Sequence, residues 1–520
     1  MSADLAFTNA TIITMNSQYY VAEAVAIRRN RICKVGTNED VLQLIGKKTR
    51  VIDLAGKTLV PGFIDTHIHV ADFGRYLAWM DLKEVGSIKQ LQTALREQVR
   101  KTPYGKWIIG RGWNESRFKE RRSPTKGDID PFTPDNPVIL YHESVQVCLV
   151  NSEALESAGI NKQTRSPPDG EIGKNREGEL TGILQNGATN LIWEVIPEHS
   201  RKDLLEMTTV AFKKIAQAGV TSIHWIVASA EELSLAQRLL VNRKLPIRVF
   251  LIIPANLLNE PINFDSKDFS NSRIGAAMIA ADGYLAAKSA ALLHSYCDSS
   301  NESGNLLLNQ EQMRDLACQV ISEDLQLIIH AVGDRAVDEA LTVIEYISKY
   351  SSNHKIRFRL EQAAVLNDRL IERLQSQKVI VSVQPLVVAS EFSTWSAEEK
   401  LGPERARWLY PLKTLLKRGI CVIGGSDCPM EPLSPLLGIQ SAITRKAFPE
   451  EDITAYEALE IYTKNAAYSS YEEELKGSIE EGKIADLTVL SDNPLSLPPD
   501  QITRINVEMT IVDGKIVYTI

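Results

Sequence analysis

The sequence predicts an α/β protein: a (β/α)8 barrel with a small β domain from both chain ends and a large insertion after the first barrel strand. Three observations carry this prediction. Short apolar runs alternate with helix-patterned stretches, eight such runs can be counted, and the two chain ends share a strand-and-turn texture. Strands that alternate with helices favour a parallel sheet, and eight of them fit a closed barrel.

The eight runs follow one another along the chain, and their near-continuous apolar character is typical of strands buried on both faces. They lie at residues 62–65, 219–223, 247–252, 277–280, 327–329, 356–360, 379–383 and 421–424. The wide gap after the first run, at about residues 70–218, holds mixed helix and loop signals and one more strand-like run at 138–141. Long excursions in a barrel usually extend the loops at its catalytic face, so we expect this insertion to cover the barrel mouth.

The two chain ends carry matching β signals. The start has apolar runs at 10–14 and 24–27 followed by a turn-like segment at 28–31, and the end has runs at 485–490, 510–512 and 515–518. The last two runs flank Asp513 and Gly514, and an Asp-Gly pair between strand residues is a strong hairpin signal. We therefore expect residues 1–60 and 480–520 to form one composite β domain, and residues 61–479 to form the barrel.

Composition sets the class of protein. Of the 520 residues, 44% are hydrophobic and 24% are charged, as in ordinary globular domains, and the net charge of −8 lacks the basic excess of a nucleic-acid-binding protein. There is no apolar run of about 18 residues and no signal-peptide pattern. The six cysteines form no C-x-x-C pair. We expect a cytoplasmic, reduced protein that acts on a small molecule and binds neither membrane nor nucleic acid.

Two histidines follow the first apolar run. His67 and His69 are two residues apart, so in a strand they would project from the same face, with Asp65 one step below. Two neighbouring imidazoles suit a borderline-soft ion such as zinc. A bare H-x-H pattern is equally compatible with two histidines that flank Ile68 by chance. The context of the pair therefore decides between these interpretations.

Two further polar residues end later runs. His330 ends the run at 327–329, and Asp427 follows the run at 421–424. Taken singly, His330 reads as a core histidine and Asp427 as a loop or helix-capping residue. Active sites of such barrels are built at the carboxyl ends of the strands, where both residues would lie together with His67 and His69. The four residues predict one divalent metal ion per chain, zinc by ligand type, with a position left open for water.

Seven segments of the sequence resemble those of a known family. They are PGFIDTHIH at 61–69, WIIGRGW at 107–113, VNSEAL at 150–155, HAVGDRA at 330–336, SVQP at 382–385, GSDCP at 425–429 and GSIEEGKIADL at 477–487. Together they resemble the amidohydrolase superfamily, in particular amidohydrolase family 3, the YtcJ-like hydrolases that include N-substituted formamide deformylases. The resemblance spans nearly the whole chain in the right order.

The resemblance implies a distorted TIM barrel with a small β-sandwich from both chain ends, and a homo-oligomer, namely a dimer. It makes His67 and His69 the first-strand metal ligands, His330 the fifth-strand ligand with a catalytic role, and Asp427 the eighth-strand ligand and general base. The implied activity is metal-dependent hydrolysis of a non-peptide carbon–nitrogen bond in an amide, formamide or cyclic amide, by a metal-activated water. Two alternatives stay open: a degenerate binding protein, and a metal-dependent isomerase on the same scaffold.

Three positions depart from the family pattern. Met278 stands where many members have a lysine, Gln362 where they have a histidine, and Gln146 where a histidine usually precedes the VNSEAL segment. Methionine is a poor ligand for a hard or borderline ion, so a second metal would lose its bridging group. One zinc per chain is therefore expected, although Glu361 remains a possible bridge from another strand.

Five polar residues are candidates for orienting or binding substrate, although each also has an ordinary structural interpretation. They are Arg111, Gln146, His224, Gln362 and Gln384. Four further histidines have no comparable setting and are expected to be structural or surface residues: His142, His199, His294 and His354.

Overall fold

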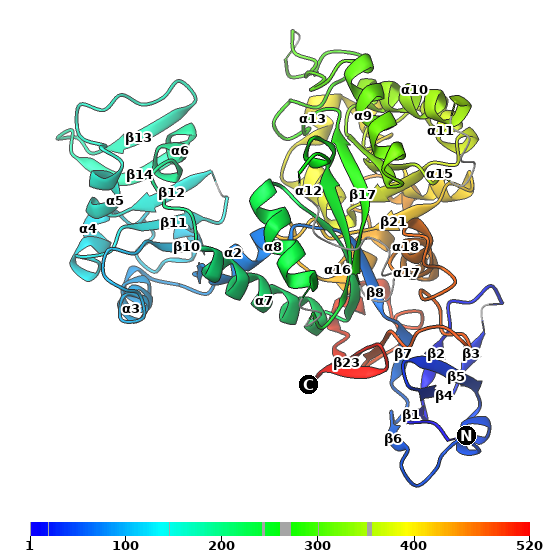
Figure 1. The fold of residues 1–520 in the computed structure, drawn as a ribbon. Helices are drawn as coiled ribbons and strands as arrows, with labels where there is room; N and C mark the ends of the chain where they lie inside the picture. The colour runs from blue at the N-terminus through cyan, green and yellow to red at the C-terminus, as the bar shows by residue number, and fades with distance from the viewer. Residues whose placement is uncertain are drawn as a thin grey trace. The chain divides into compact units, whose positions relative to one another are not determined.

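The computed structural model describes residues 2–18, 20–144, 146–241, 245–260, 272–299, 301–350 and 356–520, so His354 lies outside the described residues. Residues 1–73 and 208–520 form one compact unit, and residues 74–207 form a second. Figure 1 follows the chain from its blue N-terminus to its red C-terminus. The first unit holds the barrel together with the sheets of the chain ends.

Eight parallel strands form the barrel. They run in sheet order β8, β15, β16, β17, β18, β19, β20 and β21, and each overlaps one of the eight runs expected from the sequence. Their bounds are Phe63–Ile68, Val220–Ile226, Arg248–Pro254, Ser272–Ala280, Gln326–Ala331, Arg359–Gln362, Ile380–Val383 and Val422–Gly424. A parallel bridge pairs Ile68, at the end of β8, with Cys428, in the segment that follows β21. The predicted barrel is confirmed.

Amphipathic helices connect the strands. In α10 (Asp334–Tyr350) the buried residues Val337, Leu341 and Ile344 recur at helical spacing and so form one apolar face. The other helices of this unit are α1 (Asn38–Leu42), α8 (Ala230–Val241), α9 (Gln310–Ser322), α11 (Asp368–Ser376), α12 (Pro385–Ser393), α13 (Ala397–Leu401), α14 (Pro403–Ala406), α15 (Leu412–Lys417), α16 (Pro435–Ile443), α17 (Ala455–Ile461) and α18 (Lys464–Ser469). The two points at which the chain passes between the units lie in α2 (Val70–Ala78) and α7 (Arg201–Gln217).

The chain ends build two further sheets. One has the order β5-β4-β1-β6, with bounds Arg31–Gly36, Ala24–Arg28, Leu5–Thr8 and Arg50–Asp53. The other has the order β24-β23-β22-β7-β2-β3, with bounds Lys515–Thr519, Val507–Val512, Leu487–Leu490, Thr58–Pro61, Thr11–Ile13 and Val21–Ala22. Phe7, Leu59 and Ile511 belong to one buried cluster, so residues from both ends share a core.

The expected hairpin is present. Strands β23 and β24 pair antiparallel, and Asp513 and Gly514 between them have φ values of 56° and 72°. A positive φ at both central positions is the requirement of the type I′ turn that Asp-Gly favours. The sandwich-like arrangement at the chain ends is therefore confirmed, whereas the boundaries at residues 60 and 480 stay predictions.

The second unit has its own sheet and cores. Its sheet has the order β13-β14-β12-β11-β10-β9, with bounds Gly170–Lys174, Leu180–Asn186, Val147–Val150, Val138–His142, Ile108–Trp113 and Met80–Asp81. Its helices include α3 (Ile88–Val99), α4 (Lys126–Ile129), α5 (Ser152–Ser157) and α6 (Asn190–Trp193). Leu91, Trp113 and Leu149 pack together in one of its cores. That this insertion covers the barrel mouth stays a prediction.

Candidate metal centre

The carboxyl ends of the first and last barrel strands bring three candidate metal ligands together. His67 lies on β8, His69 follows it, and Asp427 follows β21. The Oδ1 atom of Asp427 lies 3.5 Å from the Nε2 atom of each histidine. Ligand atoms of the three residues all lie within 4.8 Å of one another, and no other such group of His, Cys, Asp or Glu occurs among the described residues.

Backbone contacts hold the Asp427 loop against the ligand strand. The Asp427 amide donates to the His67 carbonyl at 2.8 Å, and the His69 amide donates to the Cys428 carbonyl at 3.0 Å. A side chain at Gly425 would place its Cβ 2.6 Å from the backbone nitrogen of His67, which only glycine avoids. The two segments that carry the candidate ligands are thus packed backbone to backbone.

Asp65 supports the same loop from below. Its Oδ1 atom accepts hydrogen bonds from the amides of Ser426 at 2.9 Å and His67 at 3.2 Å. Burial raises the pKa of Asp65 to about 6, although these hydrogen bonds oppose the shift. The buried Asp65 carboxylate therefore links β8 to the loop after β21 through hydrogen bonds.

His330 lies on β18 and is buried, with its ring edge-on to Tyr284 at a centroid distance of 5.4 Å. It lies outside the close group of three, yet the charges of His67 and Asp427 both act on it. Burial, together with the charge of His67, lowers the pKa of His330 to about 4. A neutral imidazole with an available lone pair is the form that binds metal.

Glu361 lies behind His67. Its Oε2 atom is 2.7 Å from His67 Nδ1, its other oxygen contacts the guanidinium of Arg359, and both Glu361 and Arg359 are fully buried. Burial would raise the pKa of Glu361, but the charges of Arg359 and His67 outweigh it and lower the pKa to about 2. Oε2 is engaged by His67, and Oε1 is paired in charge with Arg359 although it makes no hydrogen bond among the described residues. These contacts do not support the metal-bridging role considered for Glu361.

The carboxylates make this a site for a cation. Burial disfavours a charge on His67, but Glu361 and Asp427 outweigh it and raise the pKa of His67 to about 10. Burial likewise would raise the pKa of Asp427, but hydrogen bonds from His67 and His69 hold it well below its usual value. A proton and a metal ion would compete for the same imidazole nitrogen. The donor set of two imidazoles and one carboxylate fits a divalent ion of zinc type.

The positions that depart from the family pattern have ordinary protein contacts. Met278 packs against an apolar cluster that includes Ile226 and Phe250. The Tyr410 hydroxyl donates to Gln362 Oε1, in a short contact that fixes which way the Gln362 amide points. Among the described residues, Met278 and Gln362 therefore offer no second metal position.

Two other candidates lie in the barrel interior. The Nε2 atom of Gln384 is 3.5 Å from Glu361 Oε2, and its buried Oε1 has no hydrogen-bond partner among the described residues. His224 is buried with its Nδ1 atom 2.8 Å from Arg359 Nη1. This contact supports a role for His224 in holding Arg359, while its role in substrate binding stays a prediction.

Arg111 and Gln146 belong to the second unit. The Arg111 guanidinium lies 3.5 Å from the centre of the Tyr76 ring and 3.6 Å from Asp81 Oδ2. The exposed Gln146 accepts a hydrogen bond from the Asn186 amide through its backbone carbonyl, at 2.7 Å. Their roles in substrate binding stay predictions.

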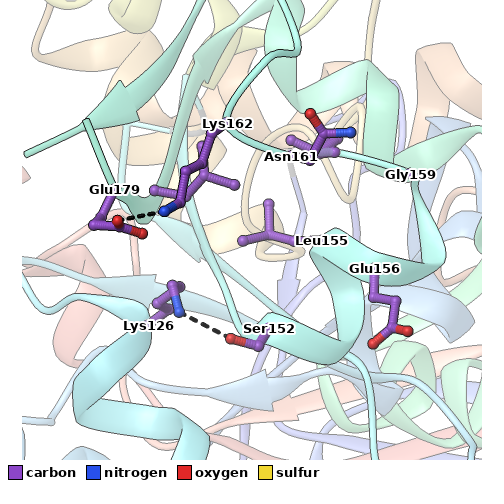
Figure 2. A pocket seen from close by; sticks show the side chains of 10 residues that line it. Lys126, Ser152, Leu155, Glu156, Gly159, Asn161, Lys162 and Glu179 are labelled. Atoms are coloured by element: carbon purple, nitrogen blue, oxygen red, sulfur yellow. Dashed lines mark hydrogen bonds and ion pairs between the residues drawn. The ribbon is translucent and has the colours of Figure 1, made fainter.

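A pocket of about 430 Å³ also lies in the second unit (Figure 2). Two of its lysines have partners: Lys162 pairs with Glu179 at 2.5 Å, and Lys126 Nζ lies 3.0 Å from Ser152 Oγ. Among the described residues, the pocket contains no group of metal ligands.

No helix in the described ranges is long and apolar enough to cross a membrane.

Comparison with known proteins decides the family. A family model described as "Amidohydrolase family" matches residues 50–518. The chain belongs to this family. It is 33% identical to "Putative amidohydrolase YtcJ" of Bacillus subtilis (strain 168), with 98% of each sequence covered, and 27% identical to the "N-substituted formamide deformylase" of Arthrobacter pascens, covering 99% of this chain and 98% of that one.

A solved structure extends this likeness to the fold. The crystal structure of an uncharacterized metal-dependent hydrolase from Pyrococcus furiosus is similar with a TM-score of 0.78 and 28% identity, covering 95% of this chain and 100% of that one. The family expected from the sequence is confirmed. This amidohydrolase is accordingly a metal-dependent hydrolase that uses a divalent ion.

The sequence alone did not identify Arg359 and Tyr410 as partners of the candidate site residues. A signal for Arg359 was available, because residues two apart on a strand share a face, and Arg359 and Glu361 are two charged residues in one buried strand. Opposite charges on one buried face have to be paired. For Tyr410 the sequence holds no such signal, because it comes from a loop segment 48 residues after Gln362.

Proposed function

We propose that this amidohydrolase cleaves a carbon–nitrogen bond in a small amide, formamide or cyclic amide, with one zinc ion held by His67, His69, His330 and Asp427. The observation that carries the proposal is the close group of His67, His69 and Asp427 at the carboxyl end of the barrel. The likeness to the Arthrobacter pascens N-substituted formamide deformylase supports the substrate class.

The metal is proposed to be single. Met278 packs in an apolar cluster, Gln362 is engaged by Tyr410, and both oxygens of Glu361 face His67 and Arg359. None of these groups is disposed to bridge two ions. When bound, a divalent ion supplies Lewis acidity that lowers the pKa of a water molecule and polarises a carbonyl oxygen.

Asp427 is proposed to move the proton. As the general base it accepts a proton from the water that attacks the carbonyl carbon, and it then donates this proton to the leaving nitrogen. Its position suits this role because its backbone amide is tied to His67 and its side chain faces both imidazoles. His330 would act as a ligand that carries no charge of its own.

Five side chains are proposed to orient the substrate. The best supported is Gln362, because the bond from Tyr410 occupies its amide oxygen and leaves the NH2 group to donate to a substrate carbonyl. Gln384 offers an unpartnered amide oxygen that could accept from a substrate N–H group. The remaining three are Arg111, Gln146 and His224.

The test combines metal analysis with a substrate panel. Purified protein from zinc-supplemented expression is dialysed and analysed for metal, then assayed with an N-alkylformamide, an N-aryl acetamide and a cyclic amide. We expect about one zinc per chain and release of amine from at least one of these compounds, with oxygen from labelled water in the acid product. Two metal ions per chain would contradict the single-metal site, and no metal would favour a binding protein.

The matched variant is Asp427→Asn, which keeps the side-chain volume and removes the base. We expect turnover to fall by about 10²- to 10⁴-fold, the usual contribution of a general acid–base group. Asp486→Asn serves as a control for losing a buried carboxylate at the other end of the barrel, and its effect should appear in thermal stability. If Asp427→Asn turned over substrate like the wild type, Asp427 would not be the base.

A further inference from the structure

Strand β19 carries two charged residues in a fully buried position. Arg359 and Glu361 are each 0% exposed, and they lie two apart on the strand and so share one face. Burying an ion pair costs desolvation energy that its own attraction repays only when further hydrogen bonds satisfy both groups. Such a pair is therefore expected to have a task beyond packing, and its contacts indicate which one.

Glu361 contacts a metal-ligand candidate through the nitrogen that faces away from the metal position. Its Oε2 atom lies 2.7 Å from His67 Nδ1, while His67 Nε2 lies 3.5 Å from Asp427 Oδ1. A carboxylate accepts a proton and cannot donate one, so the neutral imidazole carries its proton on Nδ1 and its lone pair on Nε2. The contact thus selects the tautomer of His67 that can bind a metal with Nε2.

Arg359 fixes Glu361 in turn. Its guanidinium contacts the second oxygen of Glu361, donates from Nη2 to the Thr66 carbonyl at 2.6 Å, and lies 2.8 Å from His224 Nδ1 through Nη1. Arginine has only donors, so Nδ1 of His224 must accept. Arg359 is therefore held by Glu361, Thr66 and His224. Thr66 lies on β8, one residue before His67.

We propose that Glu361, clamped by Arg359, is the positioning residue that sets the tautomer and ring orientation of His67, and thereby the metal affinity of the centre. This inference rests on the proposed function only in taking His67 as a metal ligand. Glu361 acts through His67 and touches neither metal nor substrate. Outer carboxylate partners of this kind typically change metal affinity by 10- to 100-fold when they are removed.

The first experiment measures zinc affinity of the full chain by competition with a chromophoric chelator at neutral pH. Glu361→Gln keeps the shape of the side chain and removes its charge, and we expect zinc to bind about 10- to 100-fold more weakly. Glu391→Gln is the matched control. Glu391 is also a buried carboxylate in this unit, on α12, and its Oε2 atom has no hydrogen-bond partner among the described residues. Its zinc affinity should equal that of the wild type.

A second experiment separates positioning from a general effect of charge or folding. In a His67→Ala background, Glu361→Gln should no longer weaken zinc binding, because Glu361 would have lost the residue through which it acts. A merely electrostatic role would persist without His67. The visible spectrum of the cobalt-substituted protein should also change in Glu361→Gln and stay unchanged in Glu391→Gln, since it reports ligand geometry.

The outcomes distinguish this inference from the proposed function. One zinc per wild-type chain with equal affinity in Glu361→Gln would overturn the positioning role and leave the metal site intact. An undiminished effect of Glu361→Gln in the His67→Ala background would overturn it as well. A wild-type chain that binds no zinc would overturn both proposals. Should Glu361→Gln fail to fold, Arg359→Lys is the second variant: it keeps the charge, loses the three-point clamp, and should weaken zinc binding to a smaller degree.

Discussion

Buried charged side chains gather at both ends of the barrel, and they meet different partners there. At the amino end, Arg248 begins β16 and donates to Asp486 at 2.6 Å and to Asp513 at 3.0 Å, two residues from the C-terminal part of the chain. At the carboxyl end, Asp427 faces the imidazoles of His67 and His69.

The difference lies in how each group balances its charge. Arg248 brings a permanent positive charge to the buried carboxylate of Asp486, and the neighbouring Asp513 is partly exposed to solvent, so that end needs no added cation. The imidazoles near Asp427 are cations only while protonated, so that end gains its balance from a proton or a metal ion. The amino-end cluster is thus suited to stability and the carboxyl-end cluster to the proposed metal site, in line with the general rule for such barrels.

The largest expected effect comes from breaking the carboxyl-end cluster. His67→Ala removes one ligand and the partner of Glu361, so we expect metal content well below one per chain and no measurable turnover of the formamide panel. Elemental analysis after dialysis and an amine-release assay measure both. Metal content equal to that of the wild type would show that His67 is not a ligand.

Breaking the amino-end cluster of Arg248, Asp486 and Asp513 should lower the free energy of unfolding and leave zinc affinity unchanged. Arg248→Met leaves Asp486 buried without its cation, and we expect a loss of about 3–5 kcal/mol in the free energy of unfolding, measured by denaturant titration. Zinc affinity of the folded fraction should stay at the wild-type value. Lys34→Met, which removes an exposed partner of Glu481, is the control and should leave the midpoint unchanged. A parallel loss of zinc affinity in Arg248→Met would erase the contrast between the two ends.

A smaller effect is expected where a neutral hydrogen bond orients a side chain. Tyr410→Phe frees the Gln362 amide to turn over, and one such bond contributes about 0.5–1.5 kcal/mol, so kcat/KM should fall by about 2- to 13-fold. Tyr296→Phe is the matched control, since this buried tyrosine donates to the Ala290 carbonyl at 2.9 Å. Equal kinetics for Tyr410→Phe and the wild type would remove Gln362 from substrate orientation.

The smallest effect concerns Met278. Met278→Leu conserves volume in an apolar cluster, so we expect less than about 1.5 kcal/mol of destabilisation and an unchanged metal content of one. Calorimetry and elemental analysis provide the two readings. A drop in metal content would mean that the thioether contributes to the metal centre after all.

Much of the fold was predictable because its signals are local. Eight apolar runs are visible in the sequence, and the polar residues that follow them mark the carboxyl ends of the strands. His67, His69 and Asp427 could be grouped on that basis. Contacts of Gln362 with Tyr410, and of Glu361 with both His67 and Arg359, depend on side-chain directions in a closed barrel. Periodicity says which face a residue occupies and leaves its partner across the barrel undetermined.

Gly425 packs against His67, so this centre joins two segments of the chain that are synthesised at different times. The two segments that carry the proposed metal ligands are separated by several hundred residues, and β7, the strand directly before β8, pairs with β22. At about 5–20 residues per second, roughly 20–70 s pass between the appearance of His67 and that of Asp427. The proposed metal centre can therefore be completed only after Asp427 has been synthesised, well after His67 and His69.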